Sequence, residues 1–462
     1  MNDEALRSAP PPILPKPASK RFSTILKMAA ISILALLLLI PLTMVQSVLT
    51  ERLQRRDAAV REIASAWGRE QVVLGPILIV PYNYEKKSWR DQVTRGQIER
   101  VEVRENLRSR AFFLPRVFKA DGRLKPDRLH RGIYETVVYS GTLNFSGGFA
   151  RPSFEEWNVD PRQILWEEAE IAVFITDLRG AKESLQIRLA WQMIPLNPGC
   201  KLAGFEDGVY ARIHGLGPEM ETIPFEMHLT LNGSRSLRLA PAGVNNDVQL
   251  VSTWPDPSFQ GAFLPTEREV GPGGFRARWQ VSCYGRSYPQ QWTERNPLNA
   301  ASVDSSLFGV DLVPALDSYR YVERSIKYGI LFIALMFTTF FLFEILSAVR
   351  IHPFQYALVG SALCLFYLGL LALSEIFPFS IAYWAGAIAA SLMIALYSAG
   401  ALRSAGRGYL VAIGLALVYT FLFVIVRLQD YSLLVGTAGL FFALAIVMFV
   451  TRKVDWYMRD SG

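Results

Sequence analysis

The stretch YSLLVGTAGLFFALAIVMFV (Tyr431–Val450) carries no charge and is long enough to cross a bilayer. A spanning helix needs about 20 apolar residues, because the hydrocarbon core is about 30 Å thick. Four comparable runs precede it: Tyr328–Ile345, Pro353–Leu373, Ile381–Ala399 and Tyr409–Val426. In a membrane their backbone amides are satisfied only if they are helical. Residues 326–451 are therefore predicted to form a five-span helical bundle.

A sixth span is predicted near the N-terminus. Residues 28–45 read MAAISILALLLLIPLTMV and follow a basic, proline-rich tail over residues 1–27. We expect this tail to be disordered, because it is too polar to bury a core. A cleaved signal peptide is the competing interpretation, but the run is long for that role and no small-residue cleavage motif follows. We therefore expect an uncleaved anchor at residues 28–47.

Residues 48–325 have the mixed composition of a water-soluble domain. Val48–Trp67 repeats apolar residues at spacings of three, four and seven, which predicts a stalk helix continuing the first span. A coiled-coil pairing of this stalk is the alternative. From Gln71 the pattern changes to apolar–polar alternation, as in Ile133–Phe145 and Glu170–Thr176, which predicts strands.

Two stretches of this domain predict hairpins. Lys86–Arg110 alternates charges of opposite sign, so we expect an exposed hairpin or loop. Asn232-Gly233 lies between two alternating runs and suits the positive φ angles of a type I′ turn. The fold class predicted for the chain is thus a six-span membrane α-helical bundle, with a large β-rich, sandwich-like domain inserted between spans one and two.

The distribution of Lys and Arg predicts the topology. The N-terminal tail, the loop with Arg403 and Arg407, and residues 452–462 are basic, whereas Ser374–Ser380 has no Lys or Arg. Basic flanks stay in the cytoplasm. Both termini are therefore expected to be cytoplasmic, and the β-rich domain periplasmic. The net charge of +7 comes in part from these flanks and does not indicate a nucleic-acid partner.

The sequence offers no catalytic, cofactor or metal motif. It has no Gly-x-Ser-x-Gly elbow, phosphate-binding loop or dinucleotide glycine fingerprint, and its four His show no metal-ligand spacing. His228 is expected to face outward from a strand. No charge lies at mid-depth of a span, which argues against a proton-coupled transporter. The sequence leaves a passive pore as an alternative. It also leaves a disulfide between Cys200 and Cys283 as an alternative to two free thiols.

Six residues of the β-rich domain are candidates for partner binding, because they combine charged and aromatic groups at strand ends and in an extended loop. They are Arg131, Tyr134, Asp177, Arg179, Trp254 and Phe259. Each has a structural alternative. Asp177 would bond to the backbone of a turn in which Gly180 supplies an unusual φ. The loop with Trp254 would be a strap over the core.

Two further features concern the membrane. Glu323, Arg324 and Lys327 mark the junction between the β-rich domain and the bundle. Ala382, Gly386 and Ala390 follow one another at four-residue spacing, which permits close helix packing. Packing within one bundle is the favoured interpretation, and a homo-oligomer contact is the alternative.

An ordered set of short motifs resembles the CreD family of bacterial inner-membrane proteins. The motifs are Gly75-Pro76 with Val80-Pro81-Tyr82, Arg131-Gly132-Ile133-Tyr134, Asp177-Leu178-Arg179-Gly180, the Trp254–Pro265 loop, Gly274-Phe275-Arg276-Ala277 with Trp279, Arg324-Ser325-Ile326-Lys327-Tyr328, His352-Pro353-Phe354-Gln355-Tyr356, and Thr451-Arg452-Lys453-Val454-Asp455-Trp456-Tyr457. The resemblance implies a Gram-negative inner-membrane protein, associated with a stress response to cell-wall and β-lactam damage and with colicin tolerance. It implies no catalytic residues.

The leading hypothesis is a non-enzymatic protein of envelope maintenance that lies in the lipid bilayer and binds a periplasmic protein, a lipid or a cell-wall component. The alternative is transport or lipid handling by the bundle without proton coupling, which a wet groove lined by Ser361, Ser374 or Ser391 would favour. A third hypothesis is a periplasmic hydrolase that uses Asp177, which requires a second acid or a His in the same cleft.

Overall fold

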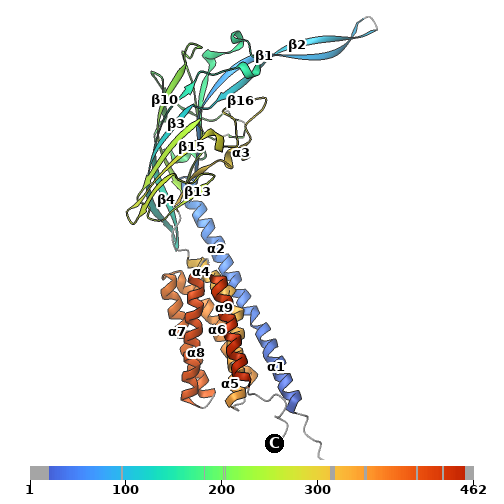
Figure 1. Ribbon diagram of the computed structural model, residues 1–462, viewed down its shortest axis with the longest axis vertical. Helices are drawn as coiled ribbons and strands as arrows, with labels where there is room; N and C mark the ends of the chain where they lie inside the picture. Colours follow the sequence, from blue (N-terminus) through green and yellow to red (C-terminus); the bar gives the residue numbers. More distant parts are fainter. Residues whose placement is uncertain are drawn as a thin grey trace, which may run out of the picture. The chain divides into compact units, whose positions relative to one another are not determined.

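The computed structural model describes residues 20–94, 97–181, 183–200, 202, 204–205, 207–312, 318–347, 351–401, 404–428 and 431–452 (Figure 1). The chain divides into two compact units. The helical unit comprises Met1–Arg55 and Asp317–Gly462, and the β unit comprises Arg56–Leu316. The predicted disordered tail lies outside the described residues up to residue 19, but from Lys20 the chain is helical, so the prediction was wrong for residues 20–27.

The helical unit confirms the predicted membrane helices. Among the described residues, five helices are long and apolar enough to span, and α4 with α5, bent by 46° at Tyr328, makes a sixth. The helices are α1 Lys20–Leu37, α2 Leu39–Trp67, α4 Ser318–Lys327, α5 Gly329–Ser347, α6 Pro353–Ser374, α7 Phe379–Ala401, α8 Ala405–Arg427 and α9 Ser432–Thr451. The first span and the predicted stalk form a nearly continuous helical segment, interrupted only at Leu38. Pro41 explains that break, because it cannot donate a hydrogen bond to the carbonyl four residues earlier.

Helix α6 lies at the centre of the bundle and contacts α1, α4, α5 and α7. Along α7, Ala382 and Ala390 are buried and Gly386 faces the ring of Phe366 in α6. This small-residue series therefore packs inside the bundle, as the favoured interpretation predicted. The hydroxyl of Tyr383 donates to the main-chain carbonyl of Tyr419 at 2.7 Å, which joins α7 to α8.

The described part of the β unit contains two sheets, as expected for a sandwich. Sheet A has nine strands, with the order β13-β17-β11-β1-β5-β9-β8; in addition, β2 pairs with β1 and β16 pairs with β2. Sheet B has eight, in the order β14-β15-β12-β3-β4-β10-β6-β7. The strands are β1 Gln71–Thr94, β2 Gln97–Phe113, β3 Val117–Arg131, β4 Tyr134–Ala150, β5 Glu170–Ile175, β6 Gln186–Leu189, β7 Gln192–Pro195, β8 Asn197–Pro198, β9 Val209–Arg212, β10 Thr222–Ser234, β11 Ser236–Leu239, β12 Asn245–Ser252, β13 Pro257–Gly261, β14 Glu267–Gly271, β15 Gly274–Ser282, β16 Gln291–Thr293 and β17 Phe308–Leu312. A five-residue helix, α3 (Ala300–Asp304), precedes β17.

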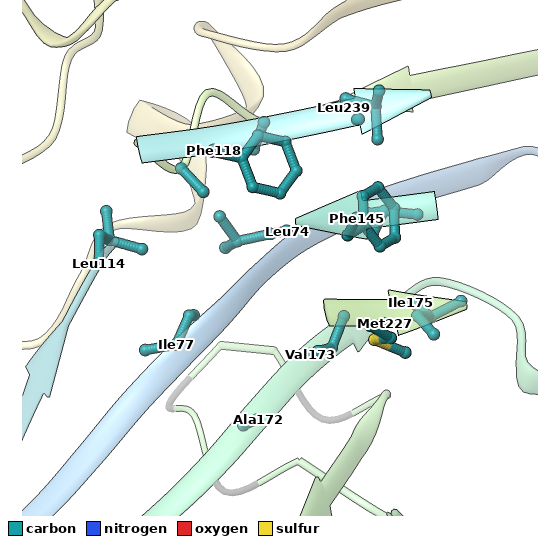
Figure 2. Packing of buried hydrophobic residues seen from close by; sticks show 14 of the residues in the cluster. Leu74, Ile77, Leu114, Phe118, Phe145, Ala172, Val173, Ile175, Met227 and Leu239 are labelled. Carbon is teal, nitrogen blue, oxygen red and sulfur yellow. The ribbon is translucent and has the colours of Figure 1, made fainter. Parts of the chain in front are cut away.

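The apolar faces of both sheets share one core. Phe118 of β3 and Phe145 of β4 stack with ring centroids 5.5 Å apart. Figure 2 shows them beside Leu74 and Ile77 of β1, which belongs to the other sheet. All four side chains are at most 2% exposed. Apolar–polar alternation places one face of each strand in this core, which is why the alternating stretches Ile133–Phe145 and Glu170–Thr176 were correctly predicted as strands.

The charged stretch Lys86–Arg110 forms a hairpin, as predicted. β1 and β2 pair in register from Leu78↔Phe113 to Thr94↔Gln97. Pairing with β5 ends at Ile79 and pairing with β16 ends at Ala111, and beyond these residues the hairpin leaves sheet A as a two-stranded ribbon (Figure 1). Ion pairs lie along it, including Lys87 to Glu102 at 3.8 Å.

The hairpin predicted at Asn232-Gly233 was wrong. Both residues belong to β10, which pairs with β4 through Asn232↔Ser140 and Gly233↔Tyr139. The chain turns only at Arg235, whose φ is +60°, and then enters β11 in the other sheet. Gly233 is needed for space, because a Cβ there would collide with the ring and hydroxyl of Tyr139. The sequence pattern was misread because close packing and a turn both select glycine.

Candidate functional site

Asp177 and Arg179 lie in a short turn directly after β5. The carboxylate of Asp177 accepts hydrogen bonds from the guanidinium of Arg179 at 2.9 and 2.8 Å, and from the main-chain N–H of Arg179 and of Arg69 at 3.1 Å each. Asp177 is buried and Arg179 is about half exposed. Burial opposes ionisation of Asp177, but the hydrogen bonds from Arg179 and Arg69 outweigh it, so the pKa of Asp177 is lowered.

The same turn is hydrogen-bonded to the side chain of Gln71, at the start of β1. The side-chain amide of Gln71 donates to the carbonyl of Asp177 at 3.1 Å and to that of Asn232 at 2.9 Å, and its oxygen accepts the N–H of Asp177 at 3.3 Å. We call Gln71, Asp177, Arg179 and Asn232 the Gln71 network. It joins the beginning of β1 to the ends of β5 and β10. The carboxylate of Asp177 is saturated with donors in this network, which favours a structural role.

Gly180 does not act through an unusual φ, so that part of the turn prediction was wrong. Its conformation lies outside the left-handed region. A Cβ at Gly180 would instead collide with the carbonyl oxygen of Asn232 and come within 3.1 Å of the Gln71 amide. Glycine therefore allows the turn to approach β10 closely.

Arg131 and Tyr134 flank the two-residue turn between β3 and β4. Gly132 has a φ of +61°, as the first central position of a type II′ turn requires. The guanidinium of Arg131 forms an ion pair of 2.5 Å with Glu62 of α2, and Tyr134 is half-buried. Arg131 thus connects the β3–β4 turn to the last turns of the stalk helix.

Trp254 lies in the core of the β unit, and Phe259 is half-buried and packs against that core. Trp254 is 5% exposed, its indole N–H donates to the carbonyl of Asp256 at 3.1 Å, and the guanidinium of Arg128 lies 5.3 Å from its ring centre. Phe259 is part of β13 and packs edge-to-face on Phe275. The structure therefore distributes the six predicted residues over three places and brings them to no common surface.

A groove that the sequence analysis missed lies on the outer face of sheet B. It has a volume of about 730 Å³ and crosses β4, β10, β6 and β7. Strand register builds it from two rows of side chains. One row is Ser146, Glu226, Arg188 and Met193, and the next is Asn144, His228, Gln186 and Pro195. We call this hollow the outer groove. The polar side chains of its two rows are Asn144, Ser146, Gln186, Arg188, Glu226 and His228.

Contacts across and along the strands hold several side chains of the outer groove in place. The Nδ1 of His228 lies 2.7 Å from the amide oxygen of Asn144, and its Nε2 lies 3.3 Å from the hydroxyl of Thr230. Arg188 forms a 3.0 Å ion pair with Glu226. His228 faces outward, as predicted. The groove itself could not be found from the sequence, because its rows join four strands from separate segments.

The comparison with known proteins covers both units. A family model described as "Inner membrane protein CreD" matches residues 23–457. The chain belongs to the CreD family. The inner membrane protein CreD of Escherichia coli (strain K12) is 31% identical over 431 residues, which is 93% of each chain. The resemblance seen in the sequence motifs is confirmed, and the match also includes the first span. This CreD-family chain is therefore a multi-pass protein of the inner membrane.

The helical unit of this CreD-family protein contains the predicted junction residues, in α4. Glu323 and Lys327 form an exposed i,i+4 ion pair of 2.9 Å. Arg324 has a different role, because its guanidinium donates to the carbonyl of Leu428 at 2.8 Å, at the C-terminal end of α8. A cation at a helix C-terminus is favoured by the helix dipole.

The three serines proposed to line a wet groove differ from one another in exposure and hydrogen bonding in this CreD-family bundle. Ser361 is exposed on α6, and the hydroxyl of Ser374 donates to the carbonyl of Leu371 in its own helix. Ser391 is half-buried on α7. Among the described residues, no three His, Cys, Asp or Glu side chains are placed to hold a metal ion. Cys200 and Cys283 are both free thiols.

Proposed function

We propose that this CreD-family protein contributes to envelope maintenance by binding an envelope partner through its β unit. In this proposal the β unit lies in the periplasm, both termini are cytoplasmic, and the protein acts without catalysis during cell-wall or β-lactam damage. Colicin tolerance on overproduction belongs to the same proposal. The family resemblance supports the stress role, and the basic flanks of the spans support the topology.

The observation that carries the binding role is the outer groove. The core of the β unit is complete without it, because the groove lies on the solvent face of sheet B while the alternate side chains of the same strands, such as Met227 and Leu229, are buried. Concave surfaces with a few fixed polar groups are the usual form of a ligand site. The Gln71 network and the buried Trp254 do not compete for this role, since their polar groups are bonded within the fold.

The topology is tested with single cysteines and a membrane-impermeant maleimide, in a background with Cys200 and Cys283 replaced by Ser and Cys364 by Ala. Tyr284 is 96% exposed in the β unit, so Tyr284→Cys should react in cells whose outer membrane alone is permeabilised. Arg452→Cys, after the last span, should react only once the inner membrane is opened. The reverse pattern would overturn the proposed orientation.

Partner binding is tested by photo-crosslinking in intact cells. A photoreactive residue replaces Arg188 in the outer groove, with Tyr284 as the exposed control in the same unit and Trp384 as the probe within the bundle. A discrete cell-wall or protein adduct specific to position 188 is the expected result. Lipid adducts from position 384, with nothing specific from position 188, would instead favour the transport or lipid-handling alternative.

A further inference from the structure

We propose that the outer groove binds a neutral oligosaccharide, such as a stretch of glycan chain. This inference rests on the proposed function and names the chemical class of the partner. It follows from the kinds of side chain that the groove presents, from its charge and from two exposed apolar side chains on the β6–β7 hairpin beside it.

The polar side chains suit vicinal hydroxyl groups. Asn144 and Gln186 each offer a donor and an acceptor in one plane, Glu226 offers two acceptors, and Arg188 offers several donors. They are neighbours across the strands, because His228 pairs with Asn144 on one side and Gln186 on the other. Directly opposed residues lie about 5 Å apart on one face of a sheet. The groove thus presents hydrogen-bond donors and acceptors side by side in two adjacent rows.

The charges argue against an anionic ligand. The described charged groups that line the groove are Glu183, Glu226 and Arg188, and the single guanidinium is already paired with Glu226 at 3.0 Å. A phosphate or an anionic lipid headgroup would meet an excess of carboxylate. A neutral hydroxylated ligand can bond to the same side chains without breaking that ion pair.

The hydrogen-bonding state of the backbone argues against an extended peptide in the groove itself. β4, β10 and β6 are interior strands of sheet B, so each is paired on both sides. A peptide that adds a strand needs an unpaired edge, and in this region the edge is β7. Recognition inside the groove must therefore come from side chains.

Two exposed apolar side chains lie on the β6–β7 hairpin beside the groove. Met193 of β7 lines the groove and is 59% exposed, and Trp191, in the turn that precedes β7, is 71% exposed. Ala190, the residue before Trp191, has a φ of +52° in the two-residue turn between β6 and β7. A non-glycine residue in that region costs about 1 kcal/mol or more, and such strain is concentrated at ligand sites. The turn holds an indole ring in solvent, where its face can stack on the C–H groups of a sugar ring.

The test uses the full chain in lipid nanodiscs, because detergents with sugar headgroups would compete. The probes are the tetramer of N-acetylglucosamine and maltotetraose, measured by saturation-transfer NMR and by calorimetry. The wild type should bind at least one of them, and Trp191→Ala should weaken binding by at least about tenfold, as loss of an aromatic anchor does. Gln186→Ala should weaken it by several-fold while thermal stability is retained.

Two matched controls keep the result specific. Trp89 is 64% exposed on the β1–β2 ribbon of the other sheet, and Gln280 is exposed on β15. Trp89→Ala and Gln280→Ala should leave the dissociation constant within about twofold. Equal weakening by Trp89→Ala would overturn the site assignment. No binding of either tetrasaccharide to the wild type at about 5 mM, above the 1 mM range of weak complexes, would overturn the inference. A protein adduct from position 188 in that case would leave the proposed function standing.

Discussion

The side-chain amide of Gln71 donates a 2.9 Å hydrogen bond to the main-chain carbonyl of Asn232, a residue 161 positions later. Gln71 is completely buried, and it also binds both the carbonyl and the N–H of Asp177. Three elements therefore depend on one side chain at the point where the stalk helix leads into β1.

Replacing Gln71 with Leu should destabilise the β unit by about 2–4 kcal/mol, because two buried carbonyls and one N–H lose their partner. The measurement is thermal unfolding of the full chain in nanodiscs, followed by tryptophan fluorescence. Gln280→Leu is the control, since Gln280 is exposed on β15. Equal stability of the two variants would show that the Gln71 network does not support the fold.

The lowered pKa of Asp177 predicts a pH dependence. A carboxyl whose folded pKa lies below its unfolded value adds stability above the unfolded value, near 3.9, and loses it as the pH falls toward the folded one. Asp177→Asn should therefore be less stable than the wild type at pH 7, by about 2 kcal/mol. The difference should shrink below about pH 4. A difference that does not depend on pH would contradict the ionised Asp177–Arg179 pair.

Gly233→Ala should lower the thermal midpoint clearly, because its Cβ would collide with the buried ring of Tyr139. Overpacking of this kind costs about 1–3 kcal/mol. Gly271→Ala is the matched control, since a Cβ there meets nothing within 4 Å. If the two alanine variants melt together, the close contact between β10 and Tyr139 is not a constraint on the fold.

The junction residues of α4 should differ in effect. Lys327→Gln removes an exposed ion pair with Glu323 and should change stability by at most about 0.5 kcal/mol. Arg324→Gln removes a charged donor from the end of α8 and should cost about 1–2 kcal/mol. Thermal unfolding in nanodiscs compares the variants, and a larger effect of Lys327→Gln would contradict the capping role of Arg324.

Local pattern was sufficient for some features of this protein and insufficient for others. The β1–β2 hairpin and the outward orientation of His228 were predictable, because alternation along a strand assigns side chains to one face or the other. The role of Asn232-Gly233 was not predictable from the sequence. A turn and a close contact between strands can both require glycine, so the same dipeptide occurs in either case. The six candidate residues were chosen by chemical type, and type does not show whether a side chain is already bonded, as Asp177 is.

The sequence by itself determined the membrane helices, because a bilayer demands a long uncharged segment whatever its neighbours are. It also determined that the middle of the chain is made of strands. Only the tertiary structure decided which strands are neighbours, and so placed Gln71 against Asn232 and Gln186 beside His228. The physical reason is that strand pairing depends on contacts between residues far apart in the chain, which local composition does not record.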